Sequence, residues 1–409
     1  MSDFTAPHDG DAAAPTTVGE PTFDPPPSPF PPPPPLSRRR FPRWAVALVV
    51  VVALIVIAVA VLNNIGTEEY ALAPGQAQPV TPFIKVPKAD NHAVHGKILL
   101  TDVFLLGPLT EWQYIWDSMN SQEAVESAAD VIGSAPESQY IASSYLDMAQ
   151  SQSDATAAAL TSLGYSVRAQ NAGVLVYGLE SGSAYPAAKV LKIGQVITKV
   201  NNAPTTSECQ LLEALAPLAP GTKVDLDVEH SYLNDEGTFE SGPVKPETVT
   251  LGQAPKSGPV TGCGAPISQK GILGITPEQQ LDWNFPVKVS VHLADIGGPS
   301  AGLAMALGII DKLSGGQLVG HKTIAATGAI EDPQGDIGDV GGVAQKTIAV
   351  ERAGATVFFV PPQELAAAKS KDTKQLHVYA VSTLAQAIKI LERLGGRIPA
   401  NHQPAQAAP

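Results

Sequence analysis

One stretch of the chain is apolar without interruption. It runs from Trp44 to Leu62 and contains no charged side chain. As a helix rising ~1.5 Å per residue it would be about 28 Å long, close to the ~30 Å hydrocarbon thickness of a bilayer. A buried helix of a soluble protein would show a polar stripe. Residues 44–62 are therefore predicted to form a transmembrane helix.

The charges beside this stretch predict its direction through the membrane. Four arginines precede it: Arg38, Arg39, Arg40 and Arg43. The positive-inside rule places that side in the cytoplasm, so everything after Leu62 should be extracytoplasmic. A cleaved signal peptide is the alternative, because Ala58-Val59-Ala60 has small residues at a suitable spacing. The apolar run is longer than the roughly 7–15 residues of a signal sequence. We therefore expect a single-pass protein of the cell membrane.

The first 43 residues read differently from the rest. Twelve of the 37 prolines fall among the first 35 residues. Such a segment favours polyproline II and cannot bury a core. Residues 1–43 are predicted to be a disordered cytoplasmic tail, with a ligand for a proline-binding module as the alternative. Residues 399–409 are predicted to be a second disordered tail.

Residues 63–163 are predicted to be a juxtamembrane segment. Prolines mark a linker up to residue 96, and Lys97–Leu106 then predicts a buried strand. Residues 111–163 have a helical pattern that Gly164 ends. His92 and His95 are three residues apart, but no cysteine or acidic cluster accompanies them. We therefore expect no metal site there.

Between residues 164 and 255 the pattern changes to short strands around one helix. Gly173–Leu179 and Val224–Val228 predict strands, and Ser207–Leu218 predicts a helix. This stretch resembles a PDZ domain of the bacterial protease-associated type. The resemblance implies that a peptide adds as a strand beside the helix. It assigns peptide binding to Gly173, Val174, Leu175 and Val176. A domain that serves only as a spacer is the alternative.

The candidate chemistry lies in residues 265–398. An alternating strand, Val287–Val291, leads into Gly298-Pro299-Ser300-Ala301-Gly302 and a strongly apolar helix that ends at Leu313. Ser300 is thus expected at a helix N-terminus, where free N–H groups favour an anion. A serine there can attack a carbonyl while neighbouring N–H groups stabilise the oxyanion.

A nucleophilic serine needs a base, and a lysine downstream is a candidate. Residues 342–353 predict a short helix in which Lys346 shares the apolar face with Val343 and Val350. Burial would lower the pKa of its amine, and a neutral amine can accept a proton.

Three pieces in this order resemble the proteolytic domain of the Lon family of serine–lysine peptidases. They are Gly298–Gly302, Thr327-Gly328-Ala329-Ile330 and Gly341–Lys346. The resemblance assigns Ser300 as nucleophile, Lys346 as general base and Thr327 as the residue that orients the lysine. It implies hydrolysis of protein or peptide substrates without metal or other cofactor, and assembly into a hexameric ring. Lon proteins commonly carry an aspartate three residues before the serine, where this chain has Gly297.

The whole order of anchor, PDZ domain and Lon-type domain resembles the membrane-anchored Lon-like peptidases of bacteria, which lack an ATPase module. Gly315–Thr323 approaches a P-loop, but it lies between a helix and a strand, the reverse of the order that a P-loop requires. We therefore expect ATP-independent peptidase activity and an α+β multidomain fold.

Two other functions are compatible with parts of the sequence. The Gly-Pro-Ser-Ala-Gly run also fits the nucleophile elbow of an α/β-hydrolase-like esterase, with Asp372 and His377, or His292, as partners. That interpretation leaves Lys346 unexplained. A catalytically silent PDZ adaptor is the other alternative, and the presence of both Ser300 and Lys346 is against it.

Charge and cysteine content narrow the picture further. The net charge is −13, and it falls entirely after residue 43, where 35 acidic residues oppose 22 basic ones. Nucleic acid requires a basic surface, so it is not an expected partner. The chain has two cysteines, Cys209 and Cys263. Outside the cytoplasm they could form a disulfide, and two free thiols are the alternative.

Overall fold

The computed structural model describes residues 42–88, 91–133, 135–180, 185–233, 239–254, 260–261, 263–264, 266–293, 296–373 and 376–399. The tails expected at residues 1–43 and 399–409 lie almost wholly outside this range.

The apolar stretch forms one helix, α1, from Arg43 to Leu62. None of its residues is buried, and it is the one helix among the described residues long and apolar enough to cross a membrane. This agrees with the span predicted from the hydrophobic pattern. Its first part, up to Ile57, is a unit separate from the rest of the chain.

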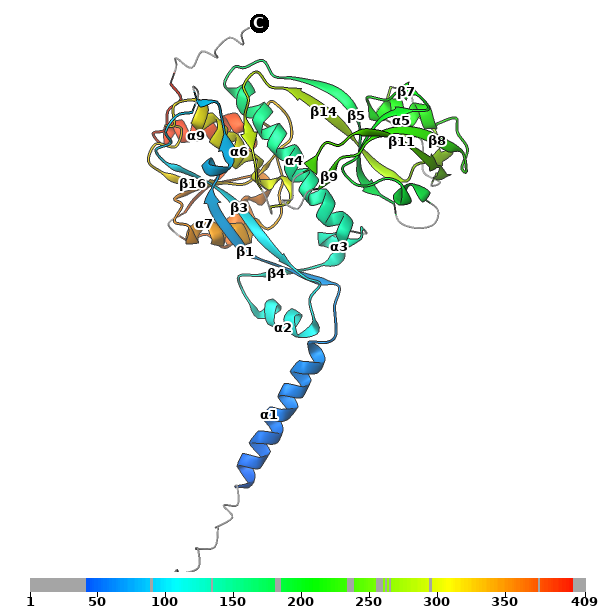
Figure 1. Cartoon of the computed structure of the whole chain (residues 1–409). Coiled ribbons are helices and arrows are strands. Elements are labelled where there is room, and N and C mark those ends of the chain that lie inside the picture. The colour runs from blue at the N-terminus through cyan, green and yellow to red at the C-terminus, as the bar shows by residue number, and fades with distance from the viewer. Residues whose placement is uncertain are drawn as a thin grey trace, which may run out of the picture. The chain divides into compact units, whose positions relative to one another are not determined.

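A six-stranded mixed sheet forms the centre of the following part (Figure 1). Its strand order is β20-β19-β16-β3-β1-β4. β3 pairs in parallel with β16, and β16 and β20 both pair in parallel with β19, whereas β1 is antiparallel to its two neighbours. The bounds are β1 Glu69–Pro79, β3 Lys97–Leu106, β4 Ala124–Ser127, β16 Thr323–Ala326, β19 Val357–Val360 and β20 His377–Ala380.

This sheet joins segments that the sequence pattern treats as separate. β3 has the bounds that the sequence predicted for a buried strand. It lies between β1 and β16 in the central sheet, so residues expected to form a juxtamembrane segment are part of the same sheet as β16. Half of the six strands come from those residues. The pairing was not predicted because parallel strands far apart in sequence have no local signature.

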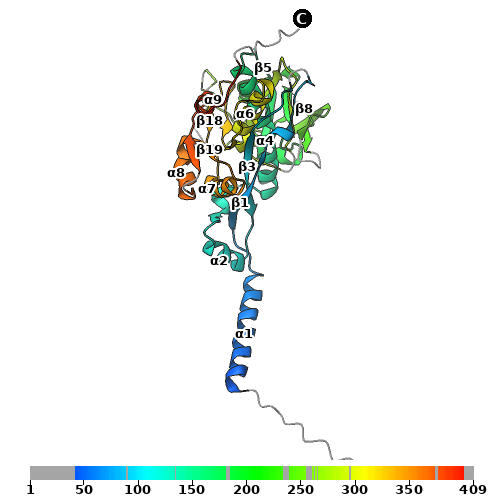
Figure 2. The same ribbon diagram turned by 90° about the vertical axis from the view of Figure 1, so that its left-hand side faces the viewer.

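Side chains alternate along the central strands and supply cores on both faces of the sheet. Ile98 and Leu100 belong to the larger core, whereas Leu99 belongs to the other. The larger core is covered by α4 Glu137–Ser162, α6 Gly302–Leu313 and α9 Leu384–Arg393. The other is covered by α7 Val343–Arg352 and α8 Leu365–Ser370. Figure 2 shows α7 and α8 on the side of the sheet away from α4.

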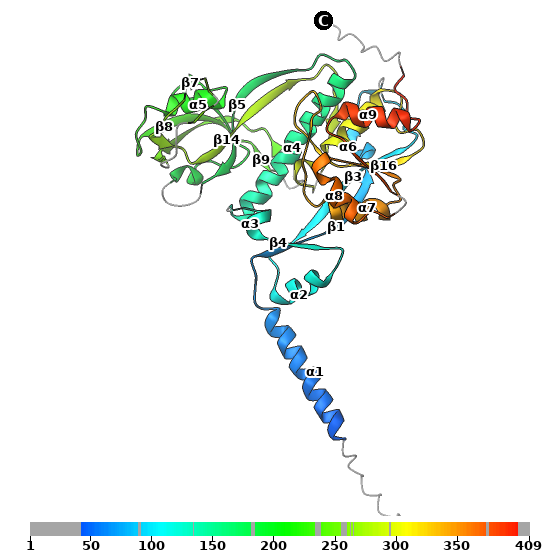
Figure 3. The same cartoon turned by 180° about the vertical axis from the view of Figure 1, so that it is seen from behind.

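The second sheet contains the PDZ-like strands, in the order β11-β8-β6-β5-β14. The bounds are β5 Arg168–Leu179, β6 Val196–Val200, β8 Lys223–Glu229, β11 Val244–Thr250 and β14 Ile275–Asn284. Helix α5, Glu208–Leu215, packs on it through Leu211 and Leu215. β5 and β14 run side by side as a long antiparallel pair (Figure 3). This sheet therefore includes a strand from beyond the predicted end of the PDZ region at residue 255.

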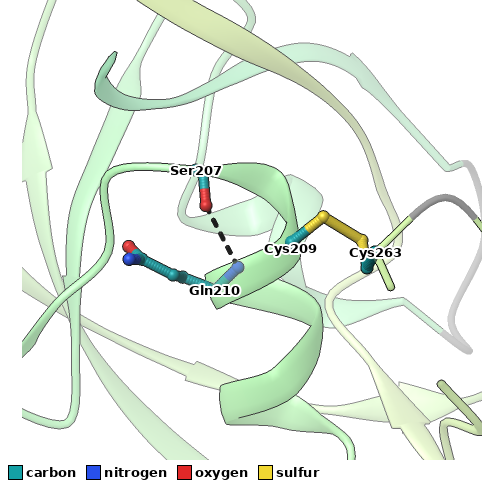
Figure 4. Close-up of a disulfide and its surroundings, with 4 residues drawn as sticks. All are labelled: Ser207, Cys209, Gln210 and Cys263. Carbon is teal, nitrogen blue, oxygen red and sulfur yellow. Dashed lines mark hydrogen bonds between the residues drawn. A yellow bond between two sulfur atoms is a disulfide. The ribbon is translucent and has the colours of Figure 1, made fainter. Parts of the chain in front are cut away.

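A disulfide closes part of this region. Cys209 of α5 and Cys263 are joined with an S–S distance of 2.10 Å and lie 54 residues apart in sequence (Figure 4). Of the two alternatives left open by the sequence, the structure contains the bridge. Figure 4 also shows the start of α5, where the Gln210 backbone N–H donates to Ser207 Oγ over 3.3 Å.

The remaining elements are short. They are η1 Thr81–Phe83, β2 Ile84–Lys85, α2 Glu111–Met119, α3 Ala128–Val131, η3 Pro186–Lys189, β7 Ala203–Pro204, β9 Tyr232–Leu233, β10 Phe239–Glu240, β12 Gly252–Gln253, β13 Gly271–Ile272, β15 Ser290–Val291, η4 Pro299–Ala301, β17 Ala329–Ile330, β18 Ile337–Gly338 and η5 Pro362–Glu364. The strand expected over residues 287–291 is thus limited to β15, which pairs with β2.

Candidate active site

Ser300 lies in a single 3₁₀ turn, η4, that runs directly into α6. It is half-buried, and α6 begins two residues later at Gly302. A Cβ on Gly302 would lie 2.8 Å from the backbone nitrogen of Ile330, so only glycine fits this close approach. The small residues around the serine therefore let the turn pack tightly against the strand region behind it.

Helix α4 holds the same turn from the other side. The Ser151 hydroxyl, with 2% of its surface exposed, donates a hydrogen bond of 2.9 Å to the Pro299 carbonyl. The Gly298 backbone N–H donates to the Ser144 carbonyl over 2.7 Å. Sequence reasoning missed this support, because it predicted α4 only as a helix of the juxtamembrane segment.

Thr327 connects the serine turn to the lysine. Thr327 lies between β16, which ends at Ala326, and β17, which begins at Ala329, and it is fully buried. Its hydroxyl donates to the Ser300 carbonyl over 3.2 Å and accepts from Lys346 Nζ over 3.3 Å. The Gly328 N–H donates to the same Ser300 carbonyl over 2.9 Å. One hydroxyl thus contacts both the backbone of the serine and the amine of the lysine.

Lys346 lies on the buried face of α7, with 3% of its surface exposed. Burial lowers the pKa of its amine from 10.5 to about 8, while the charges of Asp102 and Glu364 oppose that shift. A substantial fraction of the amine is therefore neutral at mildly alkaline pH. Asp102 on β3 and Glu364 on η5 were not expected from the sequence. The only signal for Asp102 was a charged residue within an apolar strand.

The start of α7 depends on a glycine. Gly342 has a left-handed backbone with a φ of 67°, and a Cβ there would lie 2.8 Å from Val103 Cγ1. Its carbonyl accepts a hydrogen bond of 2.9 Å from the Lys346 backbone N–H. The glycine before the helix therefore helps to fix the position of the lysine.

The structure places His377 of the esterase alternative at the opposite end of β19 from this site. His377 is exposed and pairs with Val357 at the first residue of β19. Thr327 instead bonds to Phe359, towards the end of that strand. Asp372 follows α8, and His292 is exposed. The arrangement thus favours Lys346 as the partner of Ser300.

The residues proposed for PDZ-type binding are already paired within the chain. Gly173, Val174, Leu175 and Val176 lie on β5 opposite Gln280, Gln279, Glu278 and Pro277 of β14. Gln279 Nε2 donates to the carbonyls of Gly173 and Thr206, over 3.0 and 2.9 Å. Thr206 lies just before α5. β14 therefore occupies the edge of β5 that the PDZ resemblance assigns to a peptide.

No metal centre is evident in the part of the chain that the structure describes. There, no three His, Cys, Asp or Glu side chains gather as metal ligands would.

One stretch of the chain matches a known protein family. Residues 278–392 match the family of the Lon protease (S16) C-terminal proteolytic domain. This stretch is a Lon-type proteolytic domain. The Lon-type domain so defined contains the positions of Ser300, Thr327 and Lys346. It begins after β1, β3 and α4, which complete its sheet and support its serine turn.

Curated relatives agree with this assignment. The Lon protease of Chloroflexus aggregans is 26% identical over 160 residues, which is 38% of this chain and 19% of that protein. Lon protease 1 of Herpetosiphon aurantiacus is 34% identical over 93 residues, covering 23% and 11%. The Lon protease of Clostridioides difficile is 30% identical over 171 residues, covering 42% and 20%. The chain thus spans a fifth or less of the length of these relatives.

Among solved structures, the PDZ domain of an SdrC-like protein from Listeria monocytogenes is similar. It is 18% identical, covers 26% of this chain and 90% of its own, and aligns with a TM-score of 0.20. A corresponding PDZ domain from Listeria innocua gives a TM-score of 0.19.

Proposed function

We propose that this protein is an ATP-independent serine endopeptidase in which Ser300 is the nucleophile and Lys346 the general base. The observation that carries the proposal is the buried Lys346 amine, joined through the Thr327 hydroxyl to the backbone of Ser300. The pKa of that amine, about 8, suits a base that works near neutrality.

The chemistry follows from these groups. Neutral Lys346 takes the proton of Ser300 as Oγ attacks the peptide carbonyl. Backbone N–H groups of the serine turn before α6 stabilise the oxyanion of the tetrahedral intermediate. The first two N–H groups of α6, those of Gly302 and Leu303, already donate to the Pro299 and Gly328 carbonyls. The C–N bond then breaks, and the protonated lysine gives its proton to the leaving amine. A water molecule deprotonated by Lys346 hydrolyses the acyl ester and regenerates the serine.

Thr327 is a positioning residue in this scheme. Its hydroxyl donates to the Ser300 carbonyl, so its lone pairs remain available to the Lys346 amine. This fixes the direction of the amine and leaves a nitrogen lone pair for the serine proton.

The direct test uses the full chain in detergent or nanodiscs with casein and a peptide library. Ser300→Ala and Lys346→Ala should each lower turnover by about a thousandfold or more. Lys322→Ala, which removes an exposed lysine of the same domain, should leave turnover unchanged. Activity should rise with pH around a midpoint near 8, as the amine of Lys346 loses its proton. If wild type and Lys346→Ala are equally inert on every substrate, the silent-adaptor function gains support.

We infer that the PDZ-like region engages substrate segments by exchange with β14. A peptide that adds to β5 has to displace β14 from the same edge, because β14 already pairs with it. Gln279→Ala removes the two side-chain hydrogen bonds to Gly173 and Thr206 and should tighten binding of library peptides. Gln280→Ala is the matched control, because its Nε2 bonds to Leu281 within the same strand. Lack of peptide binding by either variant would support the spacer function.

The same proposal places the enzyme in the cell membrane with its catalytic part outside the cytoplasm. It rests on α1 and on the four arginines before and at its start. Protease added outside intact cells should digest the chain after residue 62 while an N-terminal tag stays protected. Digestion of the tag instead would reverse the topology. The hexameric ring implied by the Lon resemblance is tested by native mass measurement of the purified protein.

A further inference from the structure

Helix α2 has an apolar face that the described part of the chain does not cover. Trp112, Ile115, Trp116 and Met119 recur at the spacing of one helical face. None of the residues of α2 is buried, and Trp116 and Met119 expose 64% and 81% of their surface. In a helix packed on its own protein, the apolar face is the one that should be covered.

The helix is nevertheless well formed. Thr110 and Gln113 make a complete capping box, with the Gln113 N–H donating to the Thr110 hydroxyl and the Thr110 N–H to Gln113 Oε1. The rings of Trp112 and Trp116 lie 6.4 Å apart. The exposed apolar face is therefore a defined surface rather than a frayed segment.

The start of α2 is fastened to the residues that directly follow α1. The Glu111 N–H donates to the Ile65 carbonyl over 2.9 Å, and the Thr67 N–H donates to the Leu109 carbonyl over 2.8 Å. Gly66 and Thr110 form a β-bridge. These contacts involve residues within five positions of Leu62, where α1 ends.

Further apolar side chains are exposed close to α2, on the segment before β1 and at the end of β3. Ile65, Phe104 and Leu106 expose 45%, 49% and 45% of their surface. Phe104 and Leu106 belong to the end of β3 that pairs with β1 at Ala73 and Ala71. The exposed apolar side chains thus extend from α2 to the segment that connects α1 with the sheet.

We propose that α2 lies in the interface of the bilayer that α1 spans, with its apolar face against the boundary of headgroups and acyl chains. The proposal rests on the anchoring role of α1. If α1 crosses the membrane, its end at Leu62 is at the surface, and the hydrogen bonds to Ile65 and Thr67 bring the start of α2 there. Tryptophan is enriched at this depth, because its ring is apolar and its N–H is polar.

The charges of α2 define the kind of lipid surface. The helix carries Glu111 and Asp117 but no lysine or arginine. The helix itself therefore offers no cation to anionic headgroups, and burial of its apolar area drives the binding. Arg352 and Lys371 donate to Gln122 and to the Ser121 carbonyl just after α2, so basic side chains lie beside the helix. A purely zwitterionic bilayer should nevertheless be enough for binding.

The test uses an environment-sensitive fluorophore at position 119 of the full chain. Cys209 and Cys263 are the only cysteines and are paired, so Met119→Cys provides the single reactive thiol. Gln363→Cys, at an exposed position of η5, is the control site. In phosphatidylcholine nanodiscs, the label at 119 should shift to the blue and be quenched by nitroxide lipids labelled near the headgroup. The label at 363 should do neither.

Two substitutions in the Met119→Cys background test the face itself. Trp116→Glu should abolish the shift, whereas Ser118→Glu, which adds the same charge outside the apolar stripe, should keep it. A label at 119 that resembles the one at 363 overturns the proposal. A blue shift that persists in detergent at high protein concentration, without nitroxide quenching, also overturns it and indicates that a second copy of the chain covers the face.

Two further measurements separate the role of α2 from membrane anchoring by α1 and from catalysis. Carbonate extraction of membranes reports on α1 and should give the same retention for wild type and Trp116→Glu. Peptide cleavage reports on Ser300 and Lys346. A protein that is retained and active but shows no shift at position 119 therefore contradicts only the role of α2.

Discussion

A lysine side chain is normally a cation at neutral pH, yet the fold buries Lys346 almost completely. Its pKa in the folded chain is about 8, against 10.5 when unfolded. Between these values the unfolded chain binds more protons, so the free energy of unfolding rises with pH across this window. Below pH 8 the burial cost is fully present. At 1.36 kcal/mol per pKa unit it amounts to ~3 kcal/mol.

Replacing Lys346 by methionine should therefore stabilise the protein while abolishing activity. Lys346→Met keeps the apolar stem and removes the amine, so its melting temperature should exceed that of wild type at pH 7. The difference should shrink as pH rises from 8 towards 10.5. Thermal unfolding between pH 7 and 10.5 measures this, with the exposed Lys322→Met as control. Equal melting temperatures at pH 7 would mean that burial of the Lys346 amine does not destabilise the folded protein.

Among individual residues, the sequence predicts those that lie in a recognisable motif. It does not predict residues that only the folded chain brings close to the site. Ser300, Thr327 and Lys346 could be proposed because each lies in a short run of the sequence that resembles the Lon family. Asp102 could not, because its proximity to Lys346 arises from the placement of β3 in the sheet. Ser151 was hidden for the same reason, since it reaches the serine turn from a helix about 150 residues earlier.

The start of α7 offers a test at the level of elements. Gly342 adopts a left-handed backbone and its missing side chain faces Val103, whereas a Cβ on Gly341 would meet nothing within 4 Å. Gly342→Ala should destabilise the protein by about 2 kcal/mol or more, from backbone strain and steric overlap. Gly341→Ala should change stability by less than about 0.5 kcal/mol. Denaturant unfolding compares the two, and similar losses would contradict the assigned backbone.

The contact between α4 and the serine turn can be tested in the same way. Ser151→Ala removes the hydrogen bond to the Pro299 carbonyl, which is worth ~1 kcal/mol. Because the turn positions Ser300 and not the substrate, kcat should fall several-fold while KM changes little. Ser153→Ala, about 200° further round the helix, is the control. A change confined to KM would place Ser151 in substrate binding instead.

Elements with a strong local pattern were predicted well, and their partners were not. The bounds of β3 agree with the run Lys97–Leu106, and α7 covers 343–352 within the expected 342–353. β14 was missed because Ile275–Asn284 is polar and only partly buried. It is a strand because β5 offers it a complete edge, which is a property of the fold and not of its own sequence.

At the scale of the molecule, the six-stranded sheet is assembled from segments that lie before and after the PDZ-like strands in the chain. β16 lies between β3 and β19, and α6 packs against α4, which comes before the PDZ-like strands. A chain that started at the matched Lon-type domain would expose the edge of β16 and the apolar side of α6. Burial of that side supplies much of the driving force for folding, because each fully buried aliphatic side chain contributes about 1.5–3 kcal/mol.

A fragment of residues 266–399 should accordingly fail to fold, even though it contains Ser300, Thr327 and Lys346. Residues 63–399 should unfold cooperatively, because they include β1, β3, β4 and α4. Co-expression of residues 63–165 with 266–399 should restore a soluble complex, since it returns the missing strands and the helix. Circular dichroism and thermal unfolding distinguish these cases. If residues 266–399 alone melt cooperatively at the same temperature as residues 63–399, then residues 63–165 contribute nothing to the stability of the Lon-type domain. The pairing of β3 with β16 would then be dispensable.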